Sequence, residues 1–360
     1  MDTLTHGLSS VLLARATASG SRDRTAIAAG RALSLRSRLT VGFLAGIFPD
    51  SDFLVRLIDG PLSYLKHHRG ITHSVLMLPL WAGLLSLLFV LLWRGQYHWK
   101  AFYAVCAMSL GIHIFGDVIT SFGTMILAPL SYAKFSLPST FIIDFWFSGI
   151  IILALLVAWI WRRQGQQVAL VGLATLAMYI GLQHFQAWQA RDLGRTYVQQ
   201  QELEQAEVHA LPQPLSPFNW KIVIEQPQQY HVSYVNLHRR QAIALQEEQT
   251  GMLERINAIY QPLSRLSWQT LSRYGETAAQ DLARNVWHKA MLKDIRDFML
   301  FPALYRIEQR EQGLCAWFQD HRFILGDARN VPFRFGACRN GDNDWQLYRH
   351  QGDHIVPLSP

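Results

Sequence analysis

Residues 74–93, SVLMLPLWAGLLSLLFVLLW, form a run of twenty residues without a single charge. A helix of this length, at 1.5 Å per residue, crosses the roughly 30 Å hydrocarbon core of a bilayer. Two further segments, 141–161 and 168–185, have a similar apolar texture, and the composition beyond about residue 190 is that of a soluble protein. The sequence therefore predicts an all-α polytopic membrane bundle of five to six helices, followed by an α+β soluble domain.

The basic residues lie in short loops between the apolar segments and predict the orientation of the bundle. Five arginines lie between residues 22 and 38, Arg94 and Lys100 lie in a second loop, and Arg162 and Arg163 in a third. Short cytoplasmic loops carry such an excess of Lys and Arg. With these loops inside, the expected helices alternate in direction and the C-terminal domain is extracytoplasmic; they cover about 4–18, 39–58, 74–93, 101–122, 141–161 and 168–186. Topology thus explains the net charge of +7, and we expect no nucleic-acid partner.

The sequence divides into a membrane domain at 1–190, a linker at 191–217 marked by three prolines, and an α+β domain at 218–360. Alternating apolar and polar residues predict strands at 220–225, 230–237 and 345–350, and about 251–300 is expected to be helical. Cys315 and Cys338 fall in this domain. They could form a disulfide in an oxidising compartment or remain two buried thiols.

The N-terminal segment MDTLTHGL begins with an acidic residue and has only a short apolar stretch. A cleaved signal peptide begins with a basic region, so we expect a retained helix that keeps His6 in the mature protein.

Ionisable residues inside membrane segments are costly and usually mark function or pair with one another. Such residues recur here in the motifs FPDSD (48–52), HHRGITHS (67–74) and GIHIFGD (111–117). Asp50 lies twelve residues beyond Arg38, and His113 thirteen beyond Lys100. Both positions are therefore about 18–20 Å from the cytoplasmic edge at 1.5 Å per residue. We expect the ionisable side chains to meet in one layer within the outer leaflet.

The spacing within this layer suits metal binding. His113 and Asp117 are four residues apart and share a helix face, while Asp50 and Asp52 flank a turn after Pro49. Arg69 is the candidate partner for a phosphate. The candidate metal ligands are His6, Asp50, Asp52, His68, His73, His113 and Asp117. Asp50 and Asp52 are also candidate catalytic residues with Arg69, and His67, Thr72 and Asp144 are candidate supporting residues around the ligands.

The motifs MDTLTHGL, GIFPDSD, HRGITHS and HIFGDVITSFGT together resemble the YdjM-like family of inner-membrane proteins, which are regarded as metal-dependent hydrolases. The resemblance covers about residues 1–150 and implies a location in the bacterial inner membrane. It makes the seven candidate ligands and Arg69 the motif positions of the family, and Asp144 matches an aspartate that follows FII. The family often has proline next, where this chain has Phe145.

The His-x-x-x-Asp motif is also similar to that of zinc-dependent phospholipase C and the related single-strand nucleases, which cleave phosphoesters. We therefore expect an integral membrane hydrolase with two or three divalent ions, zinc before manganese. Metal-activated water would cleave a phosphoester of a lipid or lipid-linked substrate in the bilayer. The sequence leaves the oligomeric state open.

Two other functions fit the same polar residues. An ion or metal transporter also carries intramembrane Asp and His, but it predicts polar groups through the full depth of the bilayer. A non-catalytic scaffold would use the buried polar groups only to lock its helices and would bind a partner through its outer domain.

Overall fold

The computed structural model describes residues 1–18, 21, 23–58, 60–245, 251–310, 313–325, 331–340, 344–351 and 354–358. The chain forms two compact units. The first comprises Met1–Phe53, His67–Phe185 and Pro212–Pro217, and the second comprises Leu54–Lys66, Gln186–Leu211 and Phe218–Pro360.

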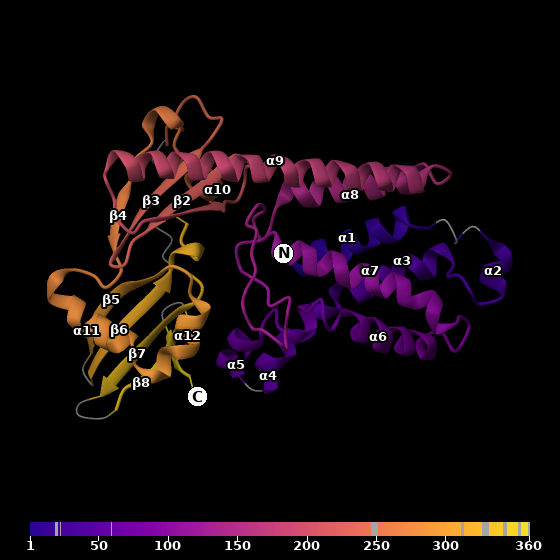
Figure 1. The fold of residues 1–360 in the computed structure, drawn as a ribbon, viewed down its shortest axis with the longest axis horizontal. Coiled ribbons are helices and arrows are strands. Elements are labelled where there is room, and N and C mark those ends of the chain that lie inside the picture. The colour runs from indigo at the N-terminus through magenta and orange to yellow at the C-terminus, as the bar shows by residue number, and fades with distance from the viewer. Residues whose placement is uncertain are drawn as a thin grey trace. The chain divides into compact units, whose positions relative to one another are not determined.

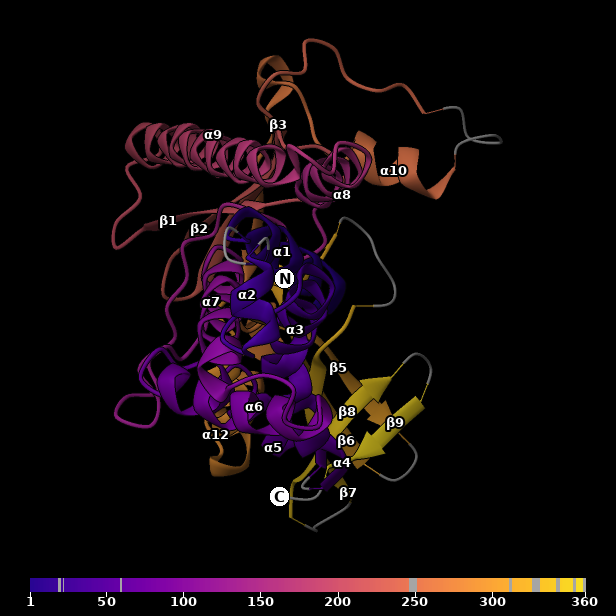
Figure 2. The same cartoon turned by 90° about the vertical axis from the view of Figure 1, so that its right-hand side faces the viewer.

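The first unit is helical (Figure 1). Its longer helices are α1 (Thr3–Ala16), α3 (Leu35–Ile47), α6 (Leu78–Leu92), α7 (Trp99–Val118), α8 (Phe145–Ile160) and the first half of α9 (Gly165–Gln200). Helices α1, α3 and α7 pack against one another, and α6 packs on α7, as Figure 2 also shows. Helix α8 and the start of α9 bury apolar side chains against α1. Short elements complete the unit: α2 (Arg24–Ala28) and the 3₁₀ turns η2 (Phe48–Leu54) and η3 (Ile71–His73).

Small residues let α1 and α3 approach closely. Gly42 and Gly46 on α3 lie four residues apart and face Ala14 and Ser10 of α1. A Cβ atom added to Gly46 would come within 2.2 Å of the Ser10 hydroxyl. Membrane helices commonly use such small-xxx-small pairs, because they gain packing when the backbones come close.

Among the described residues, two helices are long and apolar enough to cross a bilayer, α7 and α9. A third candidate span arises if Gly60–His73 and α6, which meet at a bend of 82°, are counted together. The prediction of five to six spans is therefore not confirmed beyond two to three candidates. The structure also corrects the expected helix at 39–58: α3 ends at Ile47 and the chain tightens into η2, where Pro49 lacks an N–H for a helical bond.

The expected helix at 74–93 is likewise shorter than its apolar run. Ser74 accepts hydrogen bonds through its Oγ from the N–H groups of Leu76 and Met77. This local turn competes with helix formation, so α6 begins only at Leu78. Helix α8 is similarly confined to sixteen residues.

The second unit is built on two sheets. The first has the order β1-β2-β3-β4, and the second is an antiparallel meander in the order β5-β6-β7-β8-β9. Their bounds are β1 (Glu207–Pro212), β2 (Asn219–Glu225), β3 (Gln229–Asn236), β4 (Gln269–Ser272), β5 (Pro302–Arg310), β6 (Gly313–Asp320), β7 (Arg334–Asn340), β8 (Gln346–Gln351) and β9 (His354–Pro357). The helices are α4 (Val55–Ile58), α5 (Gly60–His67), α10 (Met252–Ala258), α11 (Thr277–Trp287) and α12 (Lys293–Phe298), with a 3₁₀ turn η6 (His321–Phe323) after β6.

Strand β2 is buried on both faces, which places it at the centre of this unit. Trp220 and Ile222 pack on Ala187 and Ala190 of α9. Val223 points to the opposite face, as strand alternation requires, and packs with residues of β3 and β5.

The strands predicted at 220–225, 230–237 and 345–350 are confirmed as β2, β3 and β8. The interval 251–300 is only partly helical, because β4 interrupts it and pairs with β3. Within the interval expected as a linker, 191–217, α9 continues to Gln200 and β1 follows. Cys315 and Cys338 lie opposite each other on β6 and β7 and form a disulfide.

Candidate metal centre

Five ionisable side chains from four elements of the first unit converge on one buried point. His6 comes from α1, Asp50 from η2, His73 from η3, and His113 and Asp117 from successive turns of α7. One ligand atom from each of His6, Asp50, His113 and Asp117 lies within 4.8 Å of the others. This convergence was predicted from the loop charges, and it joins residues up to 111 positions apart.

His73 belongs to the same cluster by distance. Its Nε2 lies 3.1 Å from Nε2 of His113 and 3.1 Å from Oδ2 of Asp117. Asp50 closes another side, with its Oδ1 at 3.6 Å from Nε2 of His113 and 3.8 Å from Nε2 of His73. The imidazole nitrogens and carboxylate oxygens thus face one another directly.

The backbone of α3 fixes the ring of His113. Nδ1 of His113 donates to the carbonyl oxygen of Gly46 at 2.6 Å. The neutral ring then carries its lone pair on Nε2, the atom that faces the cluster. Metal-ligating histidines usually donate their second ring nitrogen in this way, and the contact fixes both tautomer and orientation.

Two further contacts hold the other rings. The Thr72 hydroxyl lies 3.0 Å from Nδ1 of His73. The ring of His6 stacks on that of His113 with 3.7 Å between centroids, and Gly116 makes room for it, since a Cβ there would lie 3.1 Å from Cε1 of His6. Thr72 therefore contacts His73 directly, as its predicted supporting role requires.

Asp117 is fully buried and its two oxygens differ sharply. Oδ1 contacts the amine of Met1 at 2.5 Å, Nη2 of Arg69 at 2.8 Å and Nε2 of His6 at 3.1 Å. Oδ2 makes no hydrogen bond of regular geometry, although it lies 3.1 Å from Nε2 of His73 and 3.6 Å from Nε2 of His113. A buried carboxylate oxygen without a partner carries a large desolvation penalty.

These donors fit a divalent cation. An ion would satisfy Oδ2 of Asp117 and take the lone pair on Nε2 of His113. Three imidazole nitrogens and two carboxylate oxygens form a mixed set of the kind that binds divalent metal ions. The residues that would hold it are His6, Asp50, His73, His113 and Asp117.

Arg69 sits beside the cluster in a constrained backbone conformation, with φ of 59°. Its N–H donates to Oδ2 of Asp52 at 2.8 Å, and its carbonyl accepts from Met125 at 2.9 Å. The buried guanidinium binds Asp117 and donates from Nη1 to Thr120 at 3.0 Å. Its Nε has no hydrogen-bond partner.

Asp52 and His68 form a pair next to the five-residue cluster. Nδ1 of His68 lies 3.0 Å from Oδ2 of Asp52, which is 3.7 Å from Nδ1 of His73. Asp52 therefore links the loop backbone at Arg69 with two histidine rings.

The remaining two candidates lie apart from this cluster. Asp144 caps α8: its Oδ1 accepts from the N–H groups of Trp146 and Phe147, and its Oδ2 from the Tyr179 hydroxyl. His67 ends α5 with an exposed side chain. The structure gives Asp144 a capping role at α8 and places His67 in no contact with the five donors.

Three supporting groups were not predicted from the sequence. They are the carbonyl of Gly46, the hydroxyl of Thr3, which donates to Oδ2 of Asp50 at 2.6 Å, and the hydroxyl of Thr120. The pair Gly42 and Gly46 signals close helix packing in the sequence, and that signal could have located the Gly46 contact. A single threonine carries no comparable signal.

A family model described as YdjM inner membrane protein matches residues 1–190. The match covers more than half of the 360 residues and contains all five donors of the cluster. No curated protein and no solved structure matches the chain.

Proposed function

Because the chain belongs to the YdjM inner membrane protein family, we propose that it is an integral membrane hydrolase with a divalent metal centre. One observation carries the proposal: ligand atoms of His6, Asp50, His113 and Asp117 lie within 4.8 Å of one another, and Oδ2 of buried Asp117 faces the imidazole nitrogens of His73 and His113. Purely structural buried carboxylates normally have their oxygens satisfied by donors.

The donor set favours zinc, with manganese as the second choice. His6, His73, His113, Asp50 and Asp117 would hold the first ion. Asp52 and His68, which contact each other beside His73, would supply donors for a second ion. A divalent ion in such a site lowers the pKa of a bound water and stabilises charge on a phosphoryl oxygen.

The surrounding residues have separate tasks in this proposal. Arg69 binds a phosphate oxygen through its unpartnered Nε, while its Nη2 stays on Asp117. Asp52 keeps the loop at Arg69 closed by accepting the backbone N–H.

The substrate we favour is a phosphoester of a lipid or a lipid-linked headgroup. The five candidate metal ligands lie within the region that matches the YdjM inner membrane protein family, and apolar helices flank them in the sequence. We further propose five to six membrane helices and an extracytoplasmic C-terminal domain. The positive loops and the disulfide between Cys315 and Cys338 support this orientation, since stable disulfides are typical of oxidising compartments.

The test is elemental analysis of the detergent-purified chain beside His113→Ala and Asp50→Ala. His184→Ala is the matched control, because His184 is exposed on α9. We expect at least one equivalent of zinc or manganese in the parent chain and in the control, and loss of metal in both folded site variants. A screen against phospholipid vesicles and bis(p-nitrophenyl) phosphate then tests hydrolysis. Metal binding without any hydrolysis that depends on Asp50 and His113 would contradict the enzymatic proposal.

A non-catalytic helix lock is the second candidate, because Asp117 already pairs with Arg69 and His6. These contacts join α1, α7 and the loop at η3 without an ion. The lock predicts that His113→Ala lowers thermal stability while the parent chain binds no metal even after incubation with zinc.

A further inference from the structure

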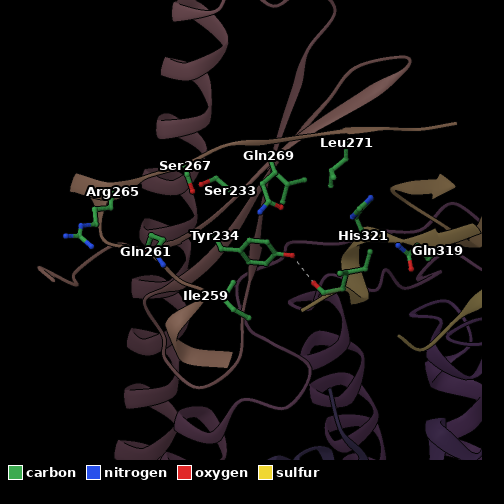
Figure 3. Close-up of a pocket in the computed structure, with 12 residues that line it drawn as sticks. Ser233, Tyr234, Ile259, Gln261, Arg265, Ser267, Gln269, Leu271, Gln319 and His321 are labelled. Carbon is green, nitrogen blue, oxygen red and sulfur yellow. Dashed lines mark hydrogen bonds between the residues drawn. The ribbon is translucent and has the colours of Figure 1, made fainter. Parts of the chain in front are cut away.

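The second unit contains a cavity of about 630 Å³, within the size range of small-molecule sites. Figure 3 shows its lining side chains. Ser233 and Tyr234 come from β3, Gln269 and Leu271 from β4, and the segment of Gln319 and His321 closes another side. All of them lie in one compact unit, apart in the chain from the metal-centre residues.

Hydrogen bonds fasten the walls of this cavity to one another. Buried Lys221 of β2 donates from Nζ to the carbonyl oxygens of His321 at 2.6 Å and Ile324 at 3.2 Å. The Tyr234 hydroxyl donates to the same Ile324 oxygen at 3.1 Å, the dashed line in Figure 3. Gln261 is held to β3 by its N–H, which donates to the Tyr234 carbonyl at 3.0 Å. A cavity braced in this way is preorganised, which lowers the entropic cost of binding.

The chemistry of the lining selects the kind of ligand. Three glutamines, Gln261, Gln269 and Gln319, offer both donors and acceptors. Hydroxyl groups of Ser267 and Tyr234 add to them, and Tyr234 also presents an aromatic ring. No carboxylate is found among the described lining residues, and Arg265 is the single permanently charged group there.

A buried polar atom without a hydrogen-bond partner adds to this lining. Of the side chains that face the cavity, His321 has such an atom in Nδ1, and the residue is 6% exposed. The pKa of His321 is lowered to about 3 by burial and by the neighbouring Lys221 cation, so at neutral pH the ring is uncharged and can both donate and accept. Such atoms gain the most when a ligand supplies the missing hydrogen bonds.

We propose that this cavity binds a neutral, hydroxyl-rich ligand, a saccharide of one or two rings. Each sugar hydroxyl both donates and accepts, as do the amides and hydroxyls of the lining, and a sugar ring packs on an aromatic face such as that of Tyr234. A phosphate or a dicarboxylate would need more than one cation. A purely apolar ligand would leave the three amides without partners.

Saccharide binding is tested on the full chain, purified in a detergent without a sugar headgroup. The probes are glucose, N-acetylglucosamine and maltose, followed by saturation-transfer NMR and calorimetry, with inorganic phosphate and glutamate as anionic comparisons. Gln269→Ala is the site variant, because Gln269 is exposed at the cavity. Gln309→Ala on β5 is the matched control, because Gln309 is exposed and outside the lining.

We expect at least one sugar to bind, and Gln269→Ala to weaken that binding about tenfold while Gln309→Ala leaves it unchanged. Gln269→Leu, which keeps the side-chain volume, should weaken binding as much as the alanine variant. The proposal is overturned if only phosphate or glutamate binds, if none of the probes binds, or if the two alanine variants behave alike. Metal content does not enter this test, so its outcome is independent of the hydrolase proposal.

Discussion

Both units of this protein bury charged side chains, but they arrange them differently. In the helical unit His6, His73, His113 and Asp117 face one another, and Oδ2 of Asp117 is left without a hydrogen bond of regular geometry. In the sheet unit buried Lys221 donates to two backbone carbonyls. The first arrangement gathers donors at one point, whereas the second fastens a loop to a strand.

Asp320 and Arg322 of the sheet unit differ from the cluster of the helical unit in the same way. Asp320 accepts from the backbone N–H of Leu300 and from Nε of Arg322, and Arg322 in turn donates to the carbonyl of Phe298. Every one of these contacts joins neighbouring segments of the fold. Burial of a charged side chain alone therefore does not identify a functional site. The kind of partner is more informative: in the helical unit the buried charged groups face other side chains, whereas in the sheet unit they bind mainly backbone groups.

Among substitutions that test this difference between the units, Asp117→Ala should have the largest effect. We expect complete loss of bound metal and a loss of stability of about 3–5 kcal/mol, because the buried Arg69 guanidinium loses its carboxylate. Metal content by mass spectrometry and thermal unfolding in detergent measure the two effects. A folded variant that retained its metal would show that Asp117 is not a ligand.

Asp320→Ala in the sheet unit should destabilise the protein by a similar mechanism and leave the metal content unchanged. Arg322 would keep its carbonyl partner on Phe298, so we expect a smaller loss of about 3 kcal/mol. Unfolding curves and metal analysis of the same preparation provide the comparison. If Asp320→Ala also released metal, the separation of roles between the units would be wrong.

Gly116→Ala probes the metal centre without removing a ligand. The added methyl would press on the His6 ring, which we expect to weaken metal binding by about 10-fold. Gly149→Ala on α8 is the matched control, since nothing lies within 4 Å of its Cβ position. The control should gain about 0.5–1 kcal/mol in stability from helix propensity and bind metal normally. Competition with a chelator gives the affinities, and equal values for the two variants would contradict the placement of His6.

The smallest effect concerns pH and the sheet unit. Burial lowers the pKa of Lys221 from its ordinary 10.5 to about 7, so above pH 7 the folded protein has released a proton that the unfolded chain keeps. The unfolded state then binds more protons, and stability rises with pH between about 7 and 10.5, by at most about 1.4 kcal/mol per unit. His321 does not interfere, because its pKa is lowered to about 3.

Lys221→Met should flatten this rise. Thermal unfolding of the full chain between pH 7 and 9, followed by near-ultraviolet circular dichroism, gives the slope for both proteins. An unchanged slope in the variant would assign the pH dependence to another group.

The sequence predicted that these polar side chains lie close together, because they are constrained twice. Their residue types are rare in apolar segments, and the loop charges place them at one depth. It could not show which carboxylate joins the five-residue cluster: Asp52 and Asp50 look alike in FPDSD, yet Asp52 binds His68 and the backbone of Arg69. Asp144 looked similar to both, but it is followed by N–H groups that it caps.

Helix ends were the least predictable feature. Hydropathy reports which residues are apolar, while the end of a helix depends on single hydrogen bonds, such as those that Ser74 Oγ accepts before α6. The strands were predicted more closely, because alternation directly reports which face is buried. The disulfide needed the register of β6 and β7, which pairs Cys315 with Cys338 and which no local pattern contains.

The distance along the chain between His6 and Asp117 has a consequence for biosynthesis. The two residues that meet at 3.1 Å are 111 positions apart. At about 5–20 residues per second, roughly 5–20 s of translation separate them. During that interval His6 of α1 has been made but its partner Asp117 has not. Asp50 likewise precedes its neighbour His113 in synthesis. The cluster of histidines and aspartates can assemble only after α7 has been made, so a ribosome that stalls before that point leaves His6 without Asp117.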